Sequence, residues 1–233
     1  MALKADLADD VRAIFKEAWE TRDGTVVPEP KDLKLSNDAV KFDGAVLYAD
    51  LDGSTSMVDA KSPAFSAEVY KAYLHCCAKL IRDAGGIITA YDGDRIMAVF
   101  IGDRKCSRAV RCGLQINWAV KNIINPVLKE CYPKSDFQVR QVVGIDTGPL
   151  FAARIGIRGG NDLVWVGSAA NYAAKLTSLS ADYPTRITQR VFKVIDDSAK
   201  YAGEAKTLMW ESVTWKDQGD MPIYRSAWSW AVA

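Results

Sequence analysis

Three aspartates lie where the sequence predicts the ends of β-structure, a place from which carboxylates readily share a metal ion. Asp50 closes the apolar run 44–49, Asp52 follows it, and Asp94 lies in a predicted hairpin turn. A carboxylate at the end of a buried strand is costly to desolvate unless a counter-charge such as a divalent cation neutralises it. If the strand and the hairpin are neighbours in one sheet, Asp50 and Asp94 meet at its edge. For Asp94 alone, a plain turn at Asp92-Gly93 is an equally good interpretation.

The residues after Asp50 form a predicted turn of small residues, Leu51-Asp-Gly-Ser-Thr-Ser56. Backbone N–H groups in such turns bind phosphate, so Gly53, Ser54 and Thr55 are candidate phosphate contacts. The turn is not a Walker A loop, because GxxxxGK[ST] occurs nowhere in the chain. An ordinary surface turn is the alternative interpretation.

An alanine-rich predicted helix, residues 168–179, carries the third set of candidates. Asn171 and Lys175 are four residues apart and therefore share one face of this helix. A lone lysine on a helix is commonly only solvated, whereas asparagine is a poor helix former and needs another reason to be there. Asn171 is therefore the stronger candidate of the two, and an ordinary solvated role is the more common interpretation for Lys175.

Apolar patterns predict the elements that must position these residues. A strand over 44–50 precedes a helix that Ser62-Pro63 begins and Gly85-Gly86 ends. A hairpin follows, with strands over 87–91 and 96–101 joined through an Asp-Gly turn.

A second helix, from about Lys105 to Asn125 and ended by Pro126, leads to a strand over 139–147. The order strand, helix, hairpin, helix, strand predicts an α+β fold with ferredoxin-like βαββαβ topology. Residues 1–40 are expected to form an N-terminal helix and extended arm, and residues 41–233 the main domain, with extra strands near its C-terminus.

Composition excludes several classes of protein. Thirty basic and twenty-nine acidic residues give a net charge of +1, which argues against binding nucleic acid through charge. No apolar run approaches the roughly 20 residues that a membrane-spanning helix needs, and Met1 to Asp10 does not resemble a signal peptide. We therefore expect a cytoplasmic protein without membrane or nucleic-acid partners. Five cysteines without a CxxC pair favour neither a disulfide framework nor a zinc site.

Four blocks of the sequence together resemble the class III nucleotidyl cyclases. They occur in family order over about residues 42–179: Phe42-Asp-Gly-Ala-Val-Leu-Tyr-Ala-Asp50-Leu-Asp-Gly-Ser-Thr55, Asp92-Gly-Asp94-Arg-Ile-Met-Ala-Val-Phe100, Val143-Gly-Ile-Asp-Thr-Gly148 and Val166-Gly-Ser-Ala-Ala-Asn171-Tyr-Ala-Ala-Lys175-Leu176. The resemblance implies a homodimer with active sites at the subunit interface.

The same resemblance implies a role for each matching residue. Asp50 and Asp94 would bind two divalent cations, Mg²⁺ or Mn²⁺, with the Leu51 carbonyl as a further ligand. Asn171 of the other subunit would orient the ribose, and Lys175 would contact the triphosphate. The family usually has arginine at the position of Lys175, so the charge is kept but the bidentate guanidinium is lost.

Two departures concern the base of the substrate. Where purine cyclases carry polar base-reading residues, this chain has Ala90 and Val164, whose side chains cannot hydrogen-bond a purine. In this respect the chain resembles the bacterial pyrimidine cyclases of the Pycsar anti-phage systems, which make cyclic UMP or cyclic CMP as a second messenger for a separate effector protein. Tyr48 and Arg95 are the candidates for reading the base, and donors there favour UTP over CTP.

Two alternatives stay open on the sequence. One is an adenylate or guanylate cyclase that reads its base through other groups. The other is a catalytically lapsed cyclase domain that binds a nucleotide without turnover, although two retained, mutually repelling carboxylates argue against it.

Overall fold

The fold is built around one long central strand, β2 (Asp38–Asp52), in a computed structural model that describes residues 2–232. β2 pairs antiparallel with β5 (Arg140–Ile157) on one side and with β4 (Arg95–Phe100) on the other. β3 (Ile87–Asp92) follows β4 as the outer strand of the hairpin. Within the described residues the main sheet has nine strands, with the order β10-β11-β7-β5-β2-β4-β3 along its principal path.

The chain order of β2, α3 (Pro63–Asp83), β3, β4, α4 (Lys105–Ala119) and β5 confirms the predicted ferredoxin-like α+β topology. Alternate residues of β2, namely Ala45, Leu47 and Ala49, are fully buried in the core that α3 and α4 contribute to. Side chains of β2 therefore point alternately to the helix-covered face of the sheet and to a second face, which carries the candidate site.

The ends of α3 follow the sequence signals. The Ser62 hydroxyl accepts a hydrogen bond from the Phe65 N–H at 3.3 Å, and Pro63 is the first helical residue. Gly85 ends the helix with a φ of +72°, which glycine adopts without strain.

The predicted end of the second helix at Pro126 is wrong. After α4 the chain makes a π-helical turn, Val120–Ile124, and continues as α5 (Asn125–Cys131), in whose first turn Pro126 lies. Proline disrupts a regular helix because it lacks an N–H and its ring clashes with the carbonyl four residues earlier, but it is tolerated at the start of a helix. The wider π turn before Pro126 allows the chain to stay helical from α4 into α5.

α6 (Ser168–Thr177) packs across β5 on the second face of the sheet. At Gly144 of β5 an added Cβ would lie 2.2 Å from the Ala173 carbonyl oxygen and 2.7 Å from the Leu176 Cβ. Only glycine permits this close approach. Ala169, Ala170 and Ala173 of α6 complete a small core with residues of β2 and β4.

The predicted C-terminal strands are confirmed. β7 (Thr185–Thr188), β11 (Met221–Ser226) and β10 (Glu211–Trp215) extend the sheet beyond β5. Between them lie α7 (Gln189–Val194), α8 (Asp197–Lys200) and the small pair β8 (Tyr201–Ala202) and β9 (Thr207–Leu208).

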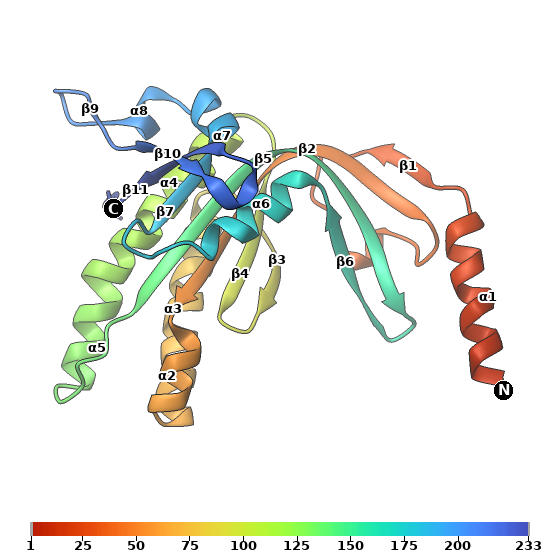
Figure 1. The fold of residues 1–233 in the computed structure, drawn as a ribbon, viewed down its shortest axis with the longest axis horizontal. Coiled ribbons are helices and arrows are strands. Elements are labelled where there is room, and N and C mark those ends of the chain that lie inside the picture. The colour runs from red at the N-terminus through yellow and green to blue at the C-terminus, as the bar shows by residue number, and fades with distance from the viewer. Residues whose placement is uncertain (1, 233) are drawn as a thin grey trace.

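The N-terminal residues form an arm that leaves the body of the molecule. α1 (Ala2–Lys16) stands apart at the far side of the β5–β6 hairpin, as Figure 1 shows, while β1 (Glu20–Asp23) runs parallel to the start of β2. β6 (Gly160–Val166) is the second strand of that hairpin. None of the described helices is long and apolar enough to cross a membrane.

Candidate active site

Asp50 and Asp94 lie at the same edge of the sheet. Asp50 is directly opposite Arg95 in the β2–β4 ladder, and Asp94 precedes Arg95 in the two-residue turn of the β3–β4 hairpin. The strand that ends at Asp50 and the hairpin that carries Asp94 are therefore neighbours in one sheet, which was the condition for the two aspartates to meet.

The electrostatics of Asp50 show that a negative charge is costly here. Burial raises the pKa of the Asp50 carboxyl, and the nearby Asp94 carboxylate raises it further. Arg95 opposes this effect with its Nε 3.4 Å from an Asp50 oxygen, and the Thr177 hydroxyl lies 3.4 Å from the same oxygen. Further positive charge beside the pair would stabilise the ionised Asp50 carboxylate.

These donors fit a magnesium or manganese site completed by substrate. Mg²⁺ is commonly held by one or two carboxylates together with phosphate oxygens and water, rather than by an all-protein cage. Among residues 2–232 no cluster of three or more His, Cys, Asp or Glu residues that could hold a metal occurs.

The neighbours of Asp50 on β2 have different surroundings. Asp52 is paired with Arg140 at 3.3 Å and therefore has its own counter-charge. Leu51 buries its side chain in the helix-covered core and lies one residue beyond the last β2–β4 pair, although β2 still pairs with β5 there. Its backbone is thus at the edge where the two aspartates meet.

Gly53, Ser54 and Thr55 form the entry to a short helix, α2 (Ser54–Ala60), rather than an irregular turn. Gly53 has a φ of +73°, and an added Cβ there would have no neighbour within 4 Å. The first intrahelical donor is the Met57 N–H, which bonds to the Gly53 carbonyl. The N–H groups before it have no partner within the helix and are available to an anion.

Tyr48 and Arg95 share the face of the sheet that carries Asp50, since Tyr48 lies two residues before Asp50 on β2. Tyr48 is directly opposite Met97, which in turn is opposite Ala90. Burial raises the pKa of the half-buried Tyr48 hydroxyl, while Arg95 opposes the change. The apolar side chains of Met97 and Ala90 therefore lie next to the Tyr48 phenol, on the sheet face that also carries Arg95 and Asp50.

Asn171 and Lys175 lie on the outer face of α6. Ala169, Ala173 and Leu176 are buried against the sheet, whereas Asn171 and Lys175 are exposed on the opposite side. The amide of Asn171 has no hydrogen-bond partner among the described residues, and Lys175 Nζ donates to Gln218 Oε1 at 3.0 Å. The structure thus does not turn these two side chains toward Asp50 of the same chain; they face outward, where a second molecule can use them.

Val164 also lies far from Asp50 within one chain. It is opposite Ala153 on the β5–β6 hairpin, and Ala153 is opposite Ala39, eleven residues along β2 from Asp50. That separation is roughly 36 Å of extended strand. A base-reading role for this position requires a second copy as well.

Sequence reasoning missed a partly buried ion pair that links β5 to the start of α6. Asp146 of β5 is completely buried and accepts hydrogen bonds from Thr188 and from Arg190, whose Nε lies 2.7 Å away. Arg190 also donates to the Ser168 hydroxyl at the start of α6. Asp146 stands in one of the family blocks, but Arg190 lies 44 residues later in the chain and no local pattern marks it. Gln218, the partner of Lys175, was missed for the same reason.

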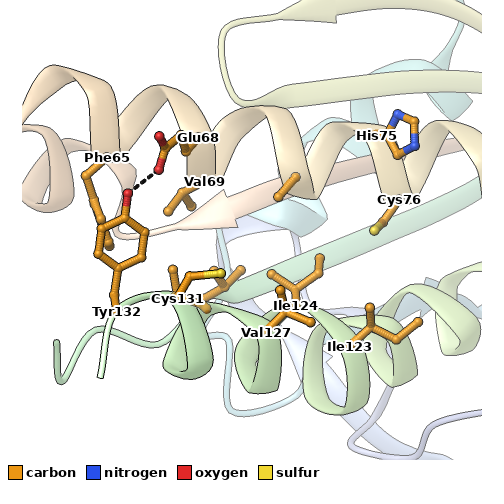
Figure 2. A pocket seen from close by; sticks show the side chains of 13 residues that line it. Phe65, Glu68, Val69, His75, Cys76, Ile123, Ile124, Val127, Cys131 and Tyr132 are labelled. Carbon is orange, nitrogen blue, oxygen red and sulfur yellow. Dashed lines mark hydrogen bonds between the residues drawn. The ribbon is translucent and has the colours of Figure 1, made fainter. Parts of the chain in front are cut away.

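The apolar pocket between α3 and α5 is separate from this site. Figure 2 shows Val69 and Cys76 of α3 facing Ile124 and Val127, with a hydrogen bond at one end from Tyr132, the residue after α5, to Glu68 of α3. The pocket lies in the helical layer, behind the sheet from Asp50, and lacks paired carboxylates. It does not provide the oxygen donors that phosphate chemistry requires.

Comparison with known proteins agrees with this geometry. The sequence profile of the family described as adenylate and guanylate cyclase catalytic domain matches residues 40–221. A uridylate cyclase of Xanthomonas perforans is 52% identical over 233 residues, and one of Burkholderia cepacia is 53% identical over 234 residues; each match covers 100% of both chains. Among solved structures, the guanylyl cyclase Cya2 aligns with a TM-score of 0.67 at 21% identity, over 82% of this chain and 94% of Cya2.

Proposed function

The chain belongs to the adenylate and guanylate cyclase catalytic domain family, and we propose that it cyclises a pyrimidine nucleoside triphosphate, UTP in preference to CTP. The observation that carries the proposal is the juxtaposition of Asp50 and Asp94 at one sheet edge, with Tyr48 and Arg95 beside them. Relatives more than 50% identical over their whole length are named uridylate cyclases, which supports the choice of UTP.

In the proposed reaction the 3'-oxygen of the nucleotide attacks its own α-phosphorus. A bond from that oxygen to phosphorus forms, the bond from phosphorus to the oxygen bridging toward the β-phosphate breaks, and the hydroxyl proton passes to solvent. The products are the 3',5'-cyclic nucleotide, cUMP or cCMP, and pyrophosphate.

Asp50, Asp94 and the Leu51 carbonyl would hold two divalent cations, Mg²⁺ or Mn²⁺. Bound there, such cations neutralise phosphate charge and lower the pKa of the 3'-hydroxyl. The N–H groups at Gly53, Ser54 and Thr55 would bind the outer phosphates, adding fixed dipoles where negative charge accumulates.

Asn171 and Lys175 of a second copy would complete the site in a homodimer. Asn171 would orient the ribose so that its hydroxyl lies in line with the breaking bond, and alignment of this kind supplies a large part of the rate. Lys175 would neutralise charge on the triphosphate as a point charge, which does not require the guanidinium that the family usually has. Both side chains point outward from α6, which supports their use in the active site of a second copy.

The base-reading proposal follows from hydrogen-bond chemistry. Uracil presents two carbonyl acceptors and one N–H, which the Arg95 guanidinium and the Tyr48 hydroxyl can match. Ala90 and Met97 beside them offer a purine edge no side-chain hydrogen bond. The cyclic product would act in the cytoplasm as a second messenger for a separate effector protein in anti-phage defence.

Mixing two inactive variants tests the interfacial site. We expect Asp94→Ala and Asn171→Ala each to abolish turnover alone. When the two are co-expressed, about half of the dimers are mixed and each mixed dimer has one intact site, so about a quarter of wild-type activity returns. No recovery in confirmed mixed dimers would contradict the two-chain site, and absence of turnover in the wild type would favour a lapsed domain.

A further inference from the structure

The N-terminal helix α1 carries an apolar stripe that the other described residues leave uncovered. Leu3, Leu7, Val11 and Ile14 recur at helical spacing on one face, with 49% to 72% of each residue exposed. An isolated helix of 15 residues is only marginally stable in water, and packing of its apolar face normally provides the missing stability. The stripe therefore calls for a partner surface.

α1 is nevertheless firmly attached at its C-terminal end. The buried Asn37 side-chain amide donates to the carbonyls of Ile14 and Glu17, both at 2.8 Å. Trp19 packs edge-on against Phe151 of β5, with 5.0 Å between ring centroids. These contacts fix the direction in which α1 leaves the body (Figure 1).

At the root of α1 the stripe continues into an apolar groove of 720 Å³. The groove runs between Ile14 and Trp19 on one side and Ile155, Val164 and Val166 of the β5–β6 hairpin on the other. We call the stripe and this groove together the arm surface. More than half of the large apolar side chains that are exposed among the described residues lie on α1, the segment after it or this hairpin.

Among the described residues that line the groove, Arg154 alone is charged, and its hydrogen bonds are made within the chain. Arg154 Nε donates to Asn161 Oδ1 at 2.9 Å, and Arg154 Nη1 donates to the Leu33 carbonyl at 3.0 Å. The groove therefore offers a partner apolar contact rather than an unpaired charge.

We infer that the arm surface is covered by a second copy of this chain. From Leu3 to Ile14 the stripe is about 16 Å long, which exceeds what a small ligand in the groove could cover and calls for a protein surface. Val166 leads through Gly167 directly into α6, whose Asn171 and Lys175 face outward. The apolar surface is therefore continuous with the face that, on the proposed function, must meet a second copy.

Two further properties suit a second copy. A net charge of +1 gives two chains little electrostatic repulsion. In a twofold dimer each chain gives and receives the same contact, so two arms would clasp one dimer and the buried apolar area would be doubled. The inference rests on the proposed function only in its choice of partner.

The test compares two double variants of the full chain. Leu7→Glu/Val11→Glu places two charges in the stripe, whereas Ala5→Glu/Ala13→Glu places two charges on the opposite face of the same helix. All four side chains are exposed in the single chain, so neither variant alters its core. Sedimentation equilibrium over a range of protein concentrations measures the mass, and nucleotide turnover is measured in parallel.

We expect a wild-type dimer, an unchanged control variant, and a dissociation constant raised at least about 100-fold in the stripe variant, because each substitution occurs twice per dimer. Turnover of the stripe variant should fall at low protein concentration and recover at high concentration. Equal masses for all three proteins would overturn the inference. A mass shift without turnover in any of them would sustain the inference and refute the proposed function.

Discussion

Replacing Gly144 with alanine tests how α6 is held against the sheet. The new Cβ would lie 2.2 Å from the Ala173 carbonyl oxygen, so this part of α6 must retreat by about 1 Å to reach an ordinary carbon–oxygen contact. Over-packing of this kind costs about 1–3 kcal/mol of the free energy of unfolding. For a chain of 233 residues that corresponds to roughly 2–12 °C in melting temperature.

The same retreat displaces the helix that carries Asn171 and Lys175. A misplacement of about 1 Å in positioning groups costs on the order of 100-fold in rate, so we expect kcat to fall by that factor while some stability remains. Gly160→Ala is the matched control, because its added Cβ would meet no atom closer than 3.9 Å. Calorimetry and initial-rate kinetics on both variants decide the matter. A Gly144→Ala protein with wild-type melting temperature and kcat would refute the packing argument.

Four other substitutions give separate expectations. Tyr48→Phe should lower kcat/KM for UTP by about 10–100-fold without changing the melting temperature, because it removes only the hydroxyl that, on the proposed function, contacts the base. Lys175→Ala should lower kcat by about 100-fold or more, as removal of a charge-stabilising group does, while Gln218→Ala should have a smaller effect because it removes only the hydrogen bond that holds Lys175. Burial raises the pKa of Asp38, but the Lys34 N–H and Arg22 outweigh it and hold the pKa below its ordinary value. A carboxyl whose pKa is lowered by folding stabilises the fold at pH values above its unfolded-state pKa of about 4, and this stabilisation is lost as the pH falls through its lower folded-state pKa. Asp38→Asn should therefore lower the free energy of unfolding by about 1.5–3 kcal/mol at pH 7 and by progressively less in acid. Denaturant titrations at several pH values measure this difference.

The topology was predictable because each element carries a local signal. The continuous apolar run over residues 44–50, the cap at Ser62-Pro63 and the Asp-Gly turn before Asp94 each depend on neighbouring residues, and together they indicate the βαββαβ order. Pro126 was misjudged because a π turn before it changes the geometry that makes proline disruptive, and no residue in that stretch announces such a turn.

The site was predictable to the extent that single residues define it. The predicted topology allows the strand that ends at Asp50 to lie beside the hairpin, so the meeting of Asp50 and Asp94 at one sheet edge could be foreseen. The ion pair of the buried Asp146 with Arg190 could not, because its partners are distant in sequence and neither residue is unusual in its local setting. The N-terminal helix could be predicted, but its standing apart from the body depends on Asn37 and Trp19 contacts that only the structure shows.

The most direct test of the account is a single incubation. The purified protein is mixed with manganese and equimolar ATP, GTP, CTP and UTP, and the products are identified by mass spectrometry. Asp94→Ala is the inactive variant, and Asp52→Ala is the matched control because that carboxylate is paired with Arg140 instead. We predict cyclic UMP as the main product, lost with Asp94→Ala and retained with Asp52→Ala. A cyclic purine as the main product, or no cyclic nucleotide at all, would contradict the account.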